Sequence, residues 1–209
     1  MKTNKLFLAA ITLIAFLQCS LMAEVITPVS ASASSYYSSS YLPSHLIDGS
    51  GQSGPNDLTQ TANADFGGDG FAWIAQGDGS AGNVSDQWVA FDLGANFTLS
   101  SADIWQYNEN YDLTRGVADF ALYTSPTADV NDATNFVGNF SLAISPANSS
   151  EPVQGFPISV SNVRLVKFAI IDDFNGGAIL DYDGLSEVKF EGNIPRLRLR
   201  FSPRIQRIC

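Results

Sequence analysis

The sequence predicts a single all-β domain built as a sandwich, and three observations lead to that fold class. Val89, Phe91 and Leu93 alternate with small or polar neighbours, as do Phe120 and Leu122, and this two-residue period is typical of half-buried strands. The composition, with 14 Phe and 7 Tyr but only 15% charged residues, favours strands over charged helices. No segment longer than one or two turns has the 3.6-residue period and the caps of a helix.

The strands follow one another with polar loops between them. The segment Gln87–Ser125 predicts three strands, separated by a turn at Gly94-Ala95-Asn96 and by a polar and aromatic loop at Asn108–Arg115. Upstream, Val25–Tyr37 predicts an extended entry with one weak strand, and Tyr41–Ser50 a short helical turn that runs into an Asp-Gly turn. The remaining predicted strands are Phe136–Ile144, Val163–Ile171 and Leu185–Phe190, and the remaining loops are 51–82, Pro126–Asn135, Ala147–Pro157 and Asp172–Gly184.

The first 23 residues have the three parts of a secretory signal peptide. Lys2 and Lys5 precede the apolar run Leu6–Leu17, and Ala23 before Glu24 is a plausible cleavage point. The run of about 12 residues is too short to span a bilayer. We therefore expect secretion to the extracellular surface after signal removal, with no membrane span in the mature chain.

Cysteine usage and charge narrow the class of protein further. The only cysteines are Cys19, in the signal peptide, and Cys209, so the mature chain has no internal disulfide, which fits a bacterial envelope. All 21 acids lie between Glu24 and Glu191, where four Lys and Arg oppose them (4 − 21 = −17), and this balance disfavours nucleic acid and anionic lipid as partners. The acids predict either a solvated acidic surface or a site for Ca²⁺.

The chain ends in a segment of different character, 193–209. It holds five of the eleven Lys and Arg and no acid, and we expect it to be disordered. An electrostatic arm and a reading-frame accident both explain this composition, so the predicted domain is 24–192.

Seven segments occur in an order that resembles a known family. PSHLIDGSG, WVAFDLG, ADIWQYN, TRGVADFALYTS, VRLVKFAI, NGG and GLSEVKF resemble the discoidin, or coagulation factor V/VIII C-type, domain, in bacterial versions similar to family 32 carbohydrate-binding modules. The resemblance covers about Val25 to Gly192. It implies an antiparallel jelly-roll β-sandwich of the galactose-binding-like type, with ligand loops at one end. Ile194-Pro195 resembles the start of a degenerate PEP-CTERM sorting tail, but Arg196 follows and the apolar helix of that pattern is missing.

The resemblance also implies a structural Ca²⁺. Similar modules hold this ion with an Asp of an early loop, nearby carbonyls and a Glu near the last strand, and hard cations favour such oxygen ligands. The alternatives are that the Asp is a turn-former before Gly49 and that the Glu is an exposed strand residue. The matching residues are Asp48 and Glu187, with carbonyls of His45, Ser53 and Ser186.

A sugar pocket is the second implied site. Sugar-binding sites combine an aromatic face with Arg, Asn or carboxylate groups, and the loop from residue 108 to 115 contains all of these residue types. The residues that correspond to the family's ligand contacts are Asn108 and Arg115, with Trp73, Tyr111 and Phe174 as stacking candidates. The alternatives are that Arg115 only bridges Asp112 or Asp119, that Trp88 and Trp105 belong to core or sheet surface, and that Asp181 and Asp183 are solvated.

These observations lead to a secreted, non-catalytic, lectin-like module that binds a glycan. Asp172-Asp173 and Asp181-x-Asp183 offer paired carboxylates, but such pairs are commonplace in a chain with 21 acids, and the sequence has no Ser or Cys elbow for His45 to activate. We therefore expect no enzyme activity. The alternative is a structural or adhesive cell-envelope protein that keeps the fold without a sugar pocket.

Overall fold

The computed structural model describes residues 23–50, 71–76, 87–108, 112–146, 152–175 and 182–194. In this part of the chain all regular structure is β, apart from three short 3₁₀ turns, and every strand pairing is antiparallel. The strands are β1 (Glu24–Ile26), β2 (Ser30–Ala33), β3 (Trp73–Ile74), β4 (Trp88–Gln106), β5 (Val117–Ser125), β6 (Asn135–Ser141), β7 (Val153–Asp173) and β8 (Gly184–Asn193), and the turns are η1 (Pro43–Leu46), η3 (Leu113–Arg115) and η4 (Val130–Asp132).

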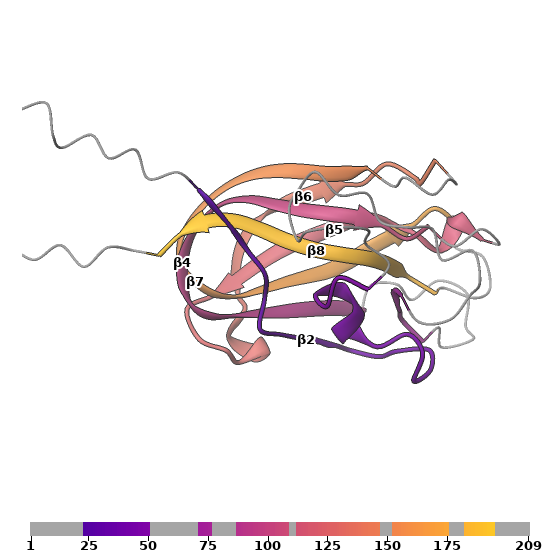
Figure 1. The fold of residues 1–209 in the computed structure, drawn as a ribbon, viewed down its shortest axis with the longest axis horizontal. Coiled ribbons are helices and arrows are strands. Elements are labelled where there is room, and N and C mark those ends of the chain that lie inside the picture. The colour runs from indigo at the N-terminus through magenta and orange to yellow at the C-terminus, as the bar shows by residue number, and fades with distance from the viewer. Residues whose placement is uncertain are drawn as a thin grey trace, which may run out of the picture.

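Two long strands, β4 and β7, bend and run through both layers of a sandwich (Figure 1). In the first layer, the first half of β4 lies between β2 and the second half of β7, and β5 and β6 follow. In the second layer, the second half of β4 lies between the first half of β7 and β8, and β8 also pairs with β1 and β3. The expected antiparallel sandwich is confirmed.

Aromatic side chains from both layers fill the core. Phe91 and Phe168 of the first layer meet Phe190 of the second, at centroid distances of 5.8 Å for Phe91 and 6.4 Å for Phe168. Phe120 of the first layer meets Phe156 of the second at 5.9 Å. The alternation in the sequence is the cause, because every second residue of these strands points inward and these rings are the inward ones. The predicted inward faces of the strands around Phe91 and Phe120 are confirmed.

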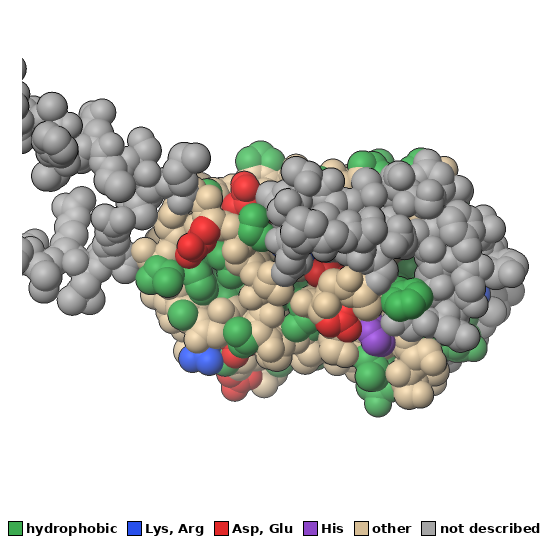
Figure 2. Space-filling view, in the orientation of Figure 1, with side chains coloured by type: hydrophobic (Ala, Val, Ile, Leu, Met, Phe, Trp, Pro, Cys, Tyr) green, Lys and Arg blue, Asp and Glu red, His purple; other side chains and the backbone are tan. Residues whose placement is uncertain are grey.

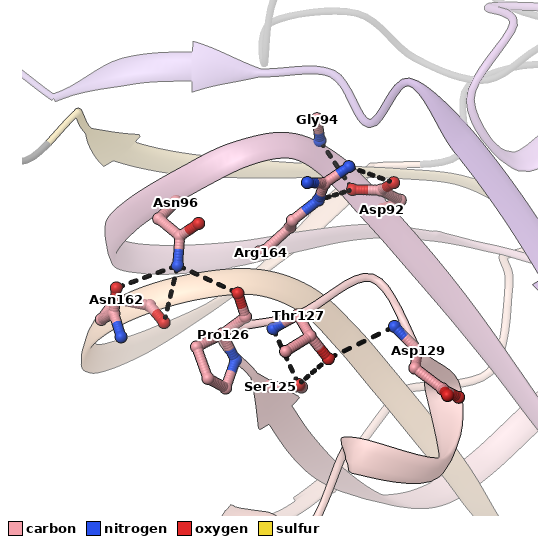
Figure 3. A network of polar contacts seen from close by, with 9 residues as sticks. All are labelled: Asp92, Gly94, Asn96, Ser125, Pro126, Thr127, Asp129, Asn162 and Arg164. Atoms are coloured by element: carbon pink, nitrogen blue, oxygen red, sulfur yellow. Dashed lines mark hydrogen bonds and ion pairs between the residues drawn. The ribbon is translucent and has the colours of Figure 1, made fainter.

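The bends of β4 and β7 are held by polar contacts (Figure 3), and we call this region the corner, residues 92–96 and 162–164. The Asn96 side-chain amide donates to Asn162 Oδ1 at 2.9 Å and to the Pro126 carbonyl at 3.2 Å. Asp92 accepts from Arg164 and, at 2.8 Å, from the amide of Gly94. Asn162 and Gly94 have φ of 62° and 80°, left-handed conformations that Asn and Gly tolerate best.

The structure differs from the expected strands at β7. The predicted loop Ala147–Pro157 contains residues 153–157, which begin this strand and pair with β4. Pro157 misled the prediction, since proline cannot donate a ladder hydrogen bond in a central strand. In the described residues the first half of β7 pairs with β4 alone, and proline is compatible with such an edge.

Both ends of the described domain lie at the same pole. Glu24 of β1 is the register partner of Gly192 of β8, and the chain enters and leaves at the left of Figure 1. Among the described residues no helix is long and apolar enough to cross a membrane. The predicted signal peptide (1–23, except its last residue) and nearly all of the basic tail (193–209) lie outside the described residues.

Candidate functional site

Loops from four distant parts of the chain meet at the pole opposite the corner, at the right of Figure 1. Gly116, just after η3, forms an isolated parallel bridge with Gly184 at the start of β8. The amide of Phe174, at the end of β7, donates to the Gly116 carbonyl at 3.3 Å. We call this region, with the end of β4, the loop pole.

Gln106, the last residue of β4, connects the loops of this pole. Its buried side-chain amide donates to the Val117 carbonyl at 2.7 Å and to the Ala143 carbonyl at 3.3 Å, while its Oε1 accepts from the Tyr107 amide at 2.9 Å. A Cβ at Gly116 would lie 2.9 Å from Gln106 Oε1, so only glycine fits there without displacing this side chain. These contacts of Gln106 fix the two ends of the segment that carries Arg115, at Tyr107 and at Gly116–Val117.

Arg115 takes part in two contacts at the loop pole. Its Nε lies 3.3 Å from Asp112 Oδ2, and its guanidinium carbon lies 5.1 Å from the centroid of the Tyr182 ring. The expected alternative, a bridge to Asp112, is therefore present. The Arg115 side chain is still 32% exposed, so the bridge does not close it off from solvent. The pair offers guanidinium donors and a carboxylate acceptor side by side, with the guanidinium over an aromatic ring.

Three tyrosines continue from Arg115 in a row that the sequence did not predict. Tyr182 meets Tyr37 at a centroid distance of 5.1 Å and an interplanar angle of 82°, and Tyr37 meets Tyr41 at 5.9 Å and 57°. Tyr37 is held in place by its amide, which donates to the Ile74 carbonyl at 2.8 Å. The sequence offered a weak sign only, since two of these tyrosines lie in segments interpreted as an extended entry and a solvated turn.

The other expected ligand residues have different surroundings. Asn108 is buried and its Oδ1 accepts a hydrogen bond from Ser145 Oγ at 2.5 Å, while Phe174 is half-buried. Trp73 is fully buried and its Nε1 donates to the Ser35 carbonyl at 3.0 Å, so its indole has no face open to a ligand. Tyr111 lies outside the described residues.

Three of the alternative interpretations are also settled by burial. Trp105 is fully buried and Trp88 is half-buried on the sheet, as expected for core or sheet surface. Asp183 is fully buried, so the expectation that it is solvated was wrong; a local pattern of turn residues does not reveal packing by distant strands. Asp181 lies outside the described residues.

The two residues expected to bind calcium lie next to each other in space. The Gly49 amide donates to Glu187 Oε2 at 3.2 Å, which brings the loop of Asp48 against β8 across 138 residues of sequence. Asp48 Oδ1 accepts from the Ser50 amide at 2.7 Å, and Asp48 Oδ2 lies 3.1 Å from His45 Nδ1. The turn-forming role of Asp48 is therefore present. The alternative of an exposed Glu187 was wrong, because this residue is fully buried.

Burial raises the pKa of Glu187 well above its usual range. The charge of Lys189 and the Gly49 amide oppose this shift, and the charge of Asp48 adds to it. Lys189 Nζ lies 4.0 Å from Glu187 Oε1, an oxygen that is buried without a hydrogen-bond partner. An under-satisfied carboxylate beside a second carboxylate has the chemistry that a hard cation requires.

The described residues supply only part of a coordination shell. No group of three His, Cys, Asp or Glu side chains comes together within the described ranges. Ser186 Oγ donates to the Gln106 carbonyl at 2.9 Å, and the carbonyls of His45 and Ser186 are the remaining candidates. Ser53 lies outside the described residues. The carboxylates present fit Ca²⁺, and the rest of the shell stays a prediction.

The fold is that of family 32 carbohydrate-binding modules. A module from a family 31 glycoside hydrolase of Clostridium perfringens is 13% identical with a TM-score of 0.54, covering 82% of this chain and 95% of that one. The family 32 module of C. perfringens NanJ in complex with galactose is 15% identical with a TM-score of 0.51, covering 81% and 99%.

A truncated AlyQ with carbohydrate-binding and alginate lyase domains is 15% identical with a TM-score of 0.50. The match covers 83% of this chain but 34% of AlyQ. No protein-family model and no curated protein matches the sequence.

Proposed function

We propose that this protein is a secreted, non-catalytic module that binds a glycan at its loop pole. The observation that carries the proposal is the Arg115–Asp112 pair at that pole, with the Arg115 guanidinium over the Tyr182 ring. The shared fold with a module solved in complex with galactose supports it. The excess of acids over Lys and Arg supports a partner other than nucleic acid.

The chemistry of the pair suits a sugar ring. A pyranose has neighbouring hydroxyls that both donate and accept hydrogen bonds, and a guanidinium with an adjacent carboxylate supplies both complements. Its C–H face packs on aromatic carbon, which Tyr182 and the half-buried Phe174 supply at this pole. Buried Asn108 fixes the end of β4 through Ser145, so its role in this proposal is to position the loop.

The carboxylate pair Asp172-Asp173 does not have the arrangement that hydrolysis of a glycan requires. Asp172 and Asp173 are successive residues of β7, and successive strand residues point to opposite faces of a sheet. Accordingly Asp172 is exposed and Asp173 is buried, so the two carboxylates do not face one substrate. This arrangement supports binding without hydrolysis at that pair.

A binding experiment with matched arginines tests the proposal. In isothermal titration with galactose, N-acetylgalactosamine and galactose-containing oligosaccharides, Arg115→Ala should weaken binding at least roughly 10-fold, because it removes a charged hydrogen-bond donor. Arg164→Ala is the control, since Arg164 is also paired with an aspartate and is 39% exposed, but lies at the corner. Arg164→Ala should leave affinity unchanged.

Two outcomes would overturn the proposal. Wild-type protein that binds no member of a broad glycan array would favour the structural or adhesive alternative, in which the fold persists without a pocket. Equal loss of binding in Arg115→Ala and Arg164→Ala would show that the effect comes from general destabilisation. The inward position of Trp73 agrees with the alternative, whereas the half-buried Phe174 does not.

We further propose that Asp48 and Glu187 hold a structural Ca²⁺ that fixes the loop after η1 against β8. When bound, the ion would supply a direct ligand contact to Glu187 Oε1, which is buried without a hydrogen bond and has Lys189 Nζ only at 4.0 Å. Calcium at 100 times its dissociation constant should stabilise the fold by about 2.7 kcal/mol, and EDTA should remove that gain. Glu187→Gln should abolish the calcium-dependent rise in Tm, and a wild-type Tm that is the same in calcium and EDTA would contradict the proposal.

A further inference from the structure

Tyr37 is the most exposed ring in the row of tyrosines at the loop pole. The residue is 52% exposed, while Tyr182 and Tyr41 are each partly buried and pack on a small apolar cluster that includes Tyr107. Tyr37 comes from the segment between β2 and η1, not from the loops after β4 or β7, and its backbone is fixed to Ile74. An exposed ring on a fixed backbone is ready to pack on a ligand without ordering a loop.

The geometry of the row creates a right-angled aromatic surface. Tyr37 and Tyr182 are almost perpendicular, at 82°, and the other neighbour of Tyr182 is the Arg115 guanidinium at 5.1 Å. Tyr182 therefore already has a cation over its ring, whereas Tyr37 retains open surface. A pyranose ring that packs on Tyr37 would lie next to Tyr182, which in turn contacts the guanidinium of the Arg115–Asp112 pair.

The charge of the surroundings bears on which sugars fit. The single positive charge of Arg115 is matched by Asp112 at 3.3 Å. The other basic side chains of the described residues lie elsewhere: Arg164 pairs with Asp92 at the corner, Lys167 lies over Trp88, and Lys189 is buried over Trp105. Acidic side chains are more widespread than basic ones on the face that Figure 2 shows. A carboxylate on the ligand would meet no unmatched cation at this pole, and the net −17 of residues 24–191 would repel it.

We propose that the loop pole selects uncharged sugar rings, which pack on Tyr37 while their hydroxyls bridge the matched Arg115–Asp112 pair. This inference rests on the proposed glycan-binding function and deepens it with a ligand class and a binding residue. A neutral sugar leaves the Arg115–Asp112 ion pair intact, and its hydroxyls can hydrogen-bond to both side chains. A uronic acid would instead bring a second carboxylate beside Asp112, and the two negative charges would repel each other.

Matched sugar pairs test the ligand class. Galactose with galacturonic acid, glucose with glucuronic acid, and mannose with mannuronic acid each differ only at C6, so titration compares a neutral hydroxymethyl group with a charged carboxylate, and the salt dependence reports the charge. The wild type should bind the neutral member of at least one pair at least about 5-fold more tightly than the acid, an effect that shrinks in high salt. Equal or tighter binding of the acid would overturn the proposal while leaving glycan binding intact.

A variant that removes the negative charge of Asp112 provides a second test of the ligand class. Asp112→Asn keeps the shape and an acceptor for Thr114 Oγ1, which donates to Asp112 Oδ1, but removes the negative charge that pairs with Arg115. The ratio of acid to neutral affinity should then rise about 5-fold, since exposed pairs of this kind contribute up to about 1 kcal/mol. Asp129→Asn, an exposed carboxylate in the loop near the corner, is the control and should leave the ratio unchanged. An unchanged ratio in Asp112→Asn would contradict the proposal.

Variants of Tyr37 and of the adjacent Tyr36 distinguish a role of Tyr37 in sugar binding from an effect on folding. Tyr37→Ala should weaken sugar binding roughly 10-fold, while Tyr37→Phe should retain most of the affinity because the ring face remains. Tyr36→Ala is the matched control, since Tyr36 is 49% exposed and adjacent in sequence. Equal affinity of Tyr37→Ala and wild type, with a bound sugar confirmed, would exclude Tyr37 as the stacking residue. Absence of any sugar binding by the wild type would instead refute the proposed function.

Discussion

Asp92 and Asp103 lie on the same strand, β4, in surroundings that shift their pKa values in opposite directions. Burial raises the pKa of Asp103 from 3.8 to about 6; the Ser101 hydroxyl opposes the shift and the charge of Glu191 adds to it. Burial also raises the pKa of Asp92, but the hydrogen bond and charge of Arg164, with the Gly94 amide, outweigh it and leave that pKa below its usual value. The two residues therefore give opposite dependences of stability on pH.

Asp103→Asn should make the protein more stable at neutral pH. The folded state prefers the protonated form of Asp103, so its favourable contribution is complete below the unfolded pKa of 3.8 and is lost as pH rises through about 6. That shift corresponds to roughly 3 kcal/mol, which the variant should recover at pH 7 relative to pH 4. Ser101 and Gly155 flank the carboxylate, and Lys189 is its register partner on β8. Urea unfolding at pH 4, 5.5 and 7 measures the effect, and parallel curves for variant and wild type would contradict it.

Asp92→Asn should have the opposite effect. A lowered pKa means that the ionised form stabilises the fold above the unfolded value of 3.8, and this contribution is lost as pH falls through the lower folded pKa. The variant should be less stable than wild type at pH 7, with the difference disappearing in strong acid, because Asn retains an acceptor for Gly94 but not a charge for Arg164. The same unfolding series, extended to pH 2, measures it.

At the site, the sequence could identify residue types but not all of their surroundings. It predicted the Asp48 and Glu187 partnership and the loop of Arg115, because both follow from motif order in the resemblance. It gave no basis for burying Trp73, whose partner Ser35 lies 38 residues away. It also missed Tyr37, since contacts across the fold, such as the one with Tyr182, leave no local pattern.

Among the elements, β4 depends on one glycine to turn from the first layer into the second. Gly94 has φ of 80°, and a Cβ there would lie 2.9 Å from Val29 Cγ1. Gly94→Ala should therefore lower the free energy of unfolding by about 1 to 2 kcal/mol from the backbone conformation, with a further loss from the contact. Chemical denaturation measures this loss.

The steric part of that loss can be separated by a double-mutant cycle. Val29→Ala removes the Cγ atoms that meet the new Cβ, so the double variant Val29→Ala/Gly94→Ala should be more stable than the sum of the single changes predicts, by at least about 0.5 kcal/mol. Strict additivity would show that the backbone conformation alone causes the effect.

The strands themselves were predictable where alternation was clear and unbroken. The predicted turn at Gly94-Ala95-Asn96 is present as the corner, but the pairing continues so closely on either side that β4 is one bent strand. The first half of β7 was hidden by Gly155 and Pro157, because its position at an edge is a property of the assembled sheet. That β4 and β7 serve both layers was not predicted, because the alternation indicated separate strands and the resemblance implied only the sandwich.

For the whole molecule, the sharing of β4 and β7 predicts cooperative unfolding. Neither layer can separate without disrupting both strands, so unfolding should follow one transition. Trp88 lies in the first layer and Trp105 in the second, and each can be monitored alone by replacing the other tryptophans with Phe. The fluorescence midpoints in urea should coincide with that of far-UV circular dichroism measured on the same variant. Separate midpoints would contradict shared cooperativity.

The register of β1 with β8 has a consequence for how such a domain can be combined with others. Because Glu24 and Gly192 are antiparallel partners, the chain arrives and departs about 5 Å apart. A polypeptide of another protein could therefore be opened at a surface turn and receive the domain as an insertion, with little change in the spacing of the cut ends. In such a chimera the loop pole would point away from the host, so its tyrosine row and ion pair would face the medium.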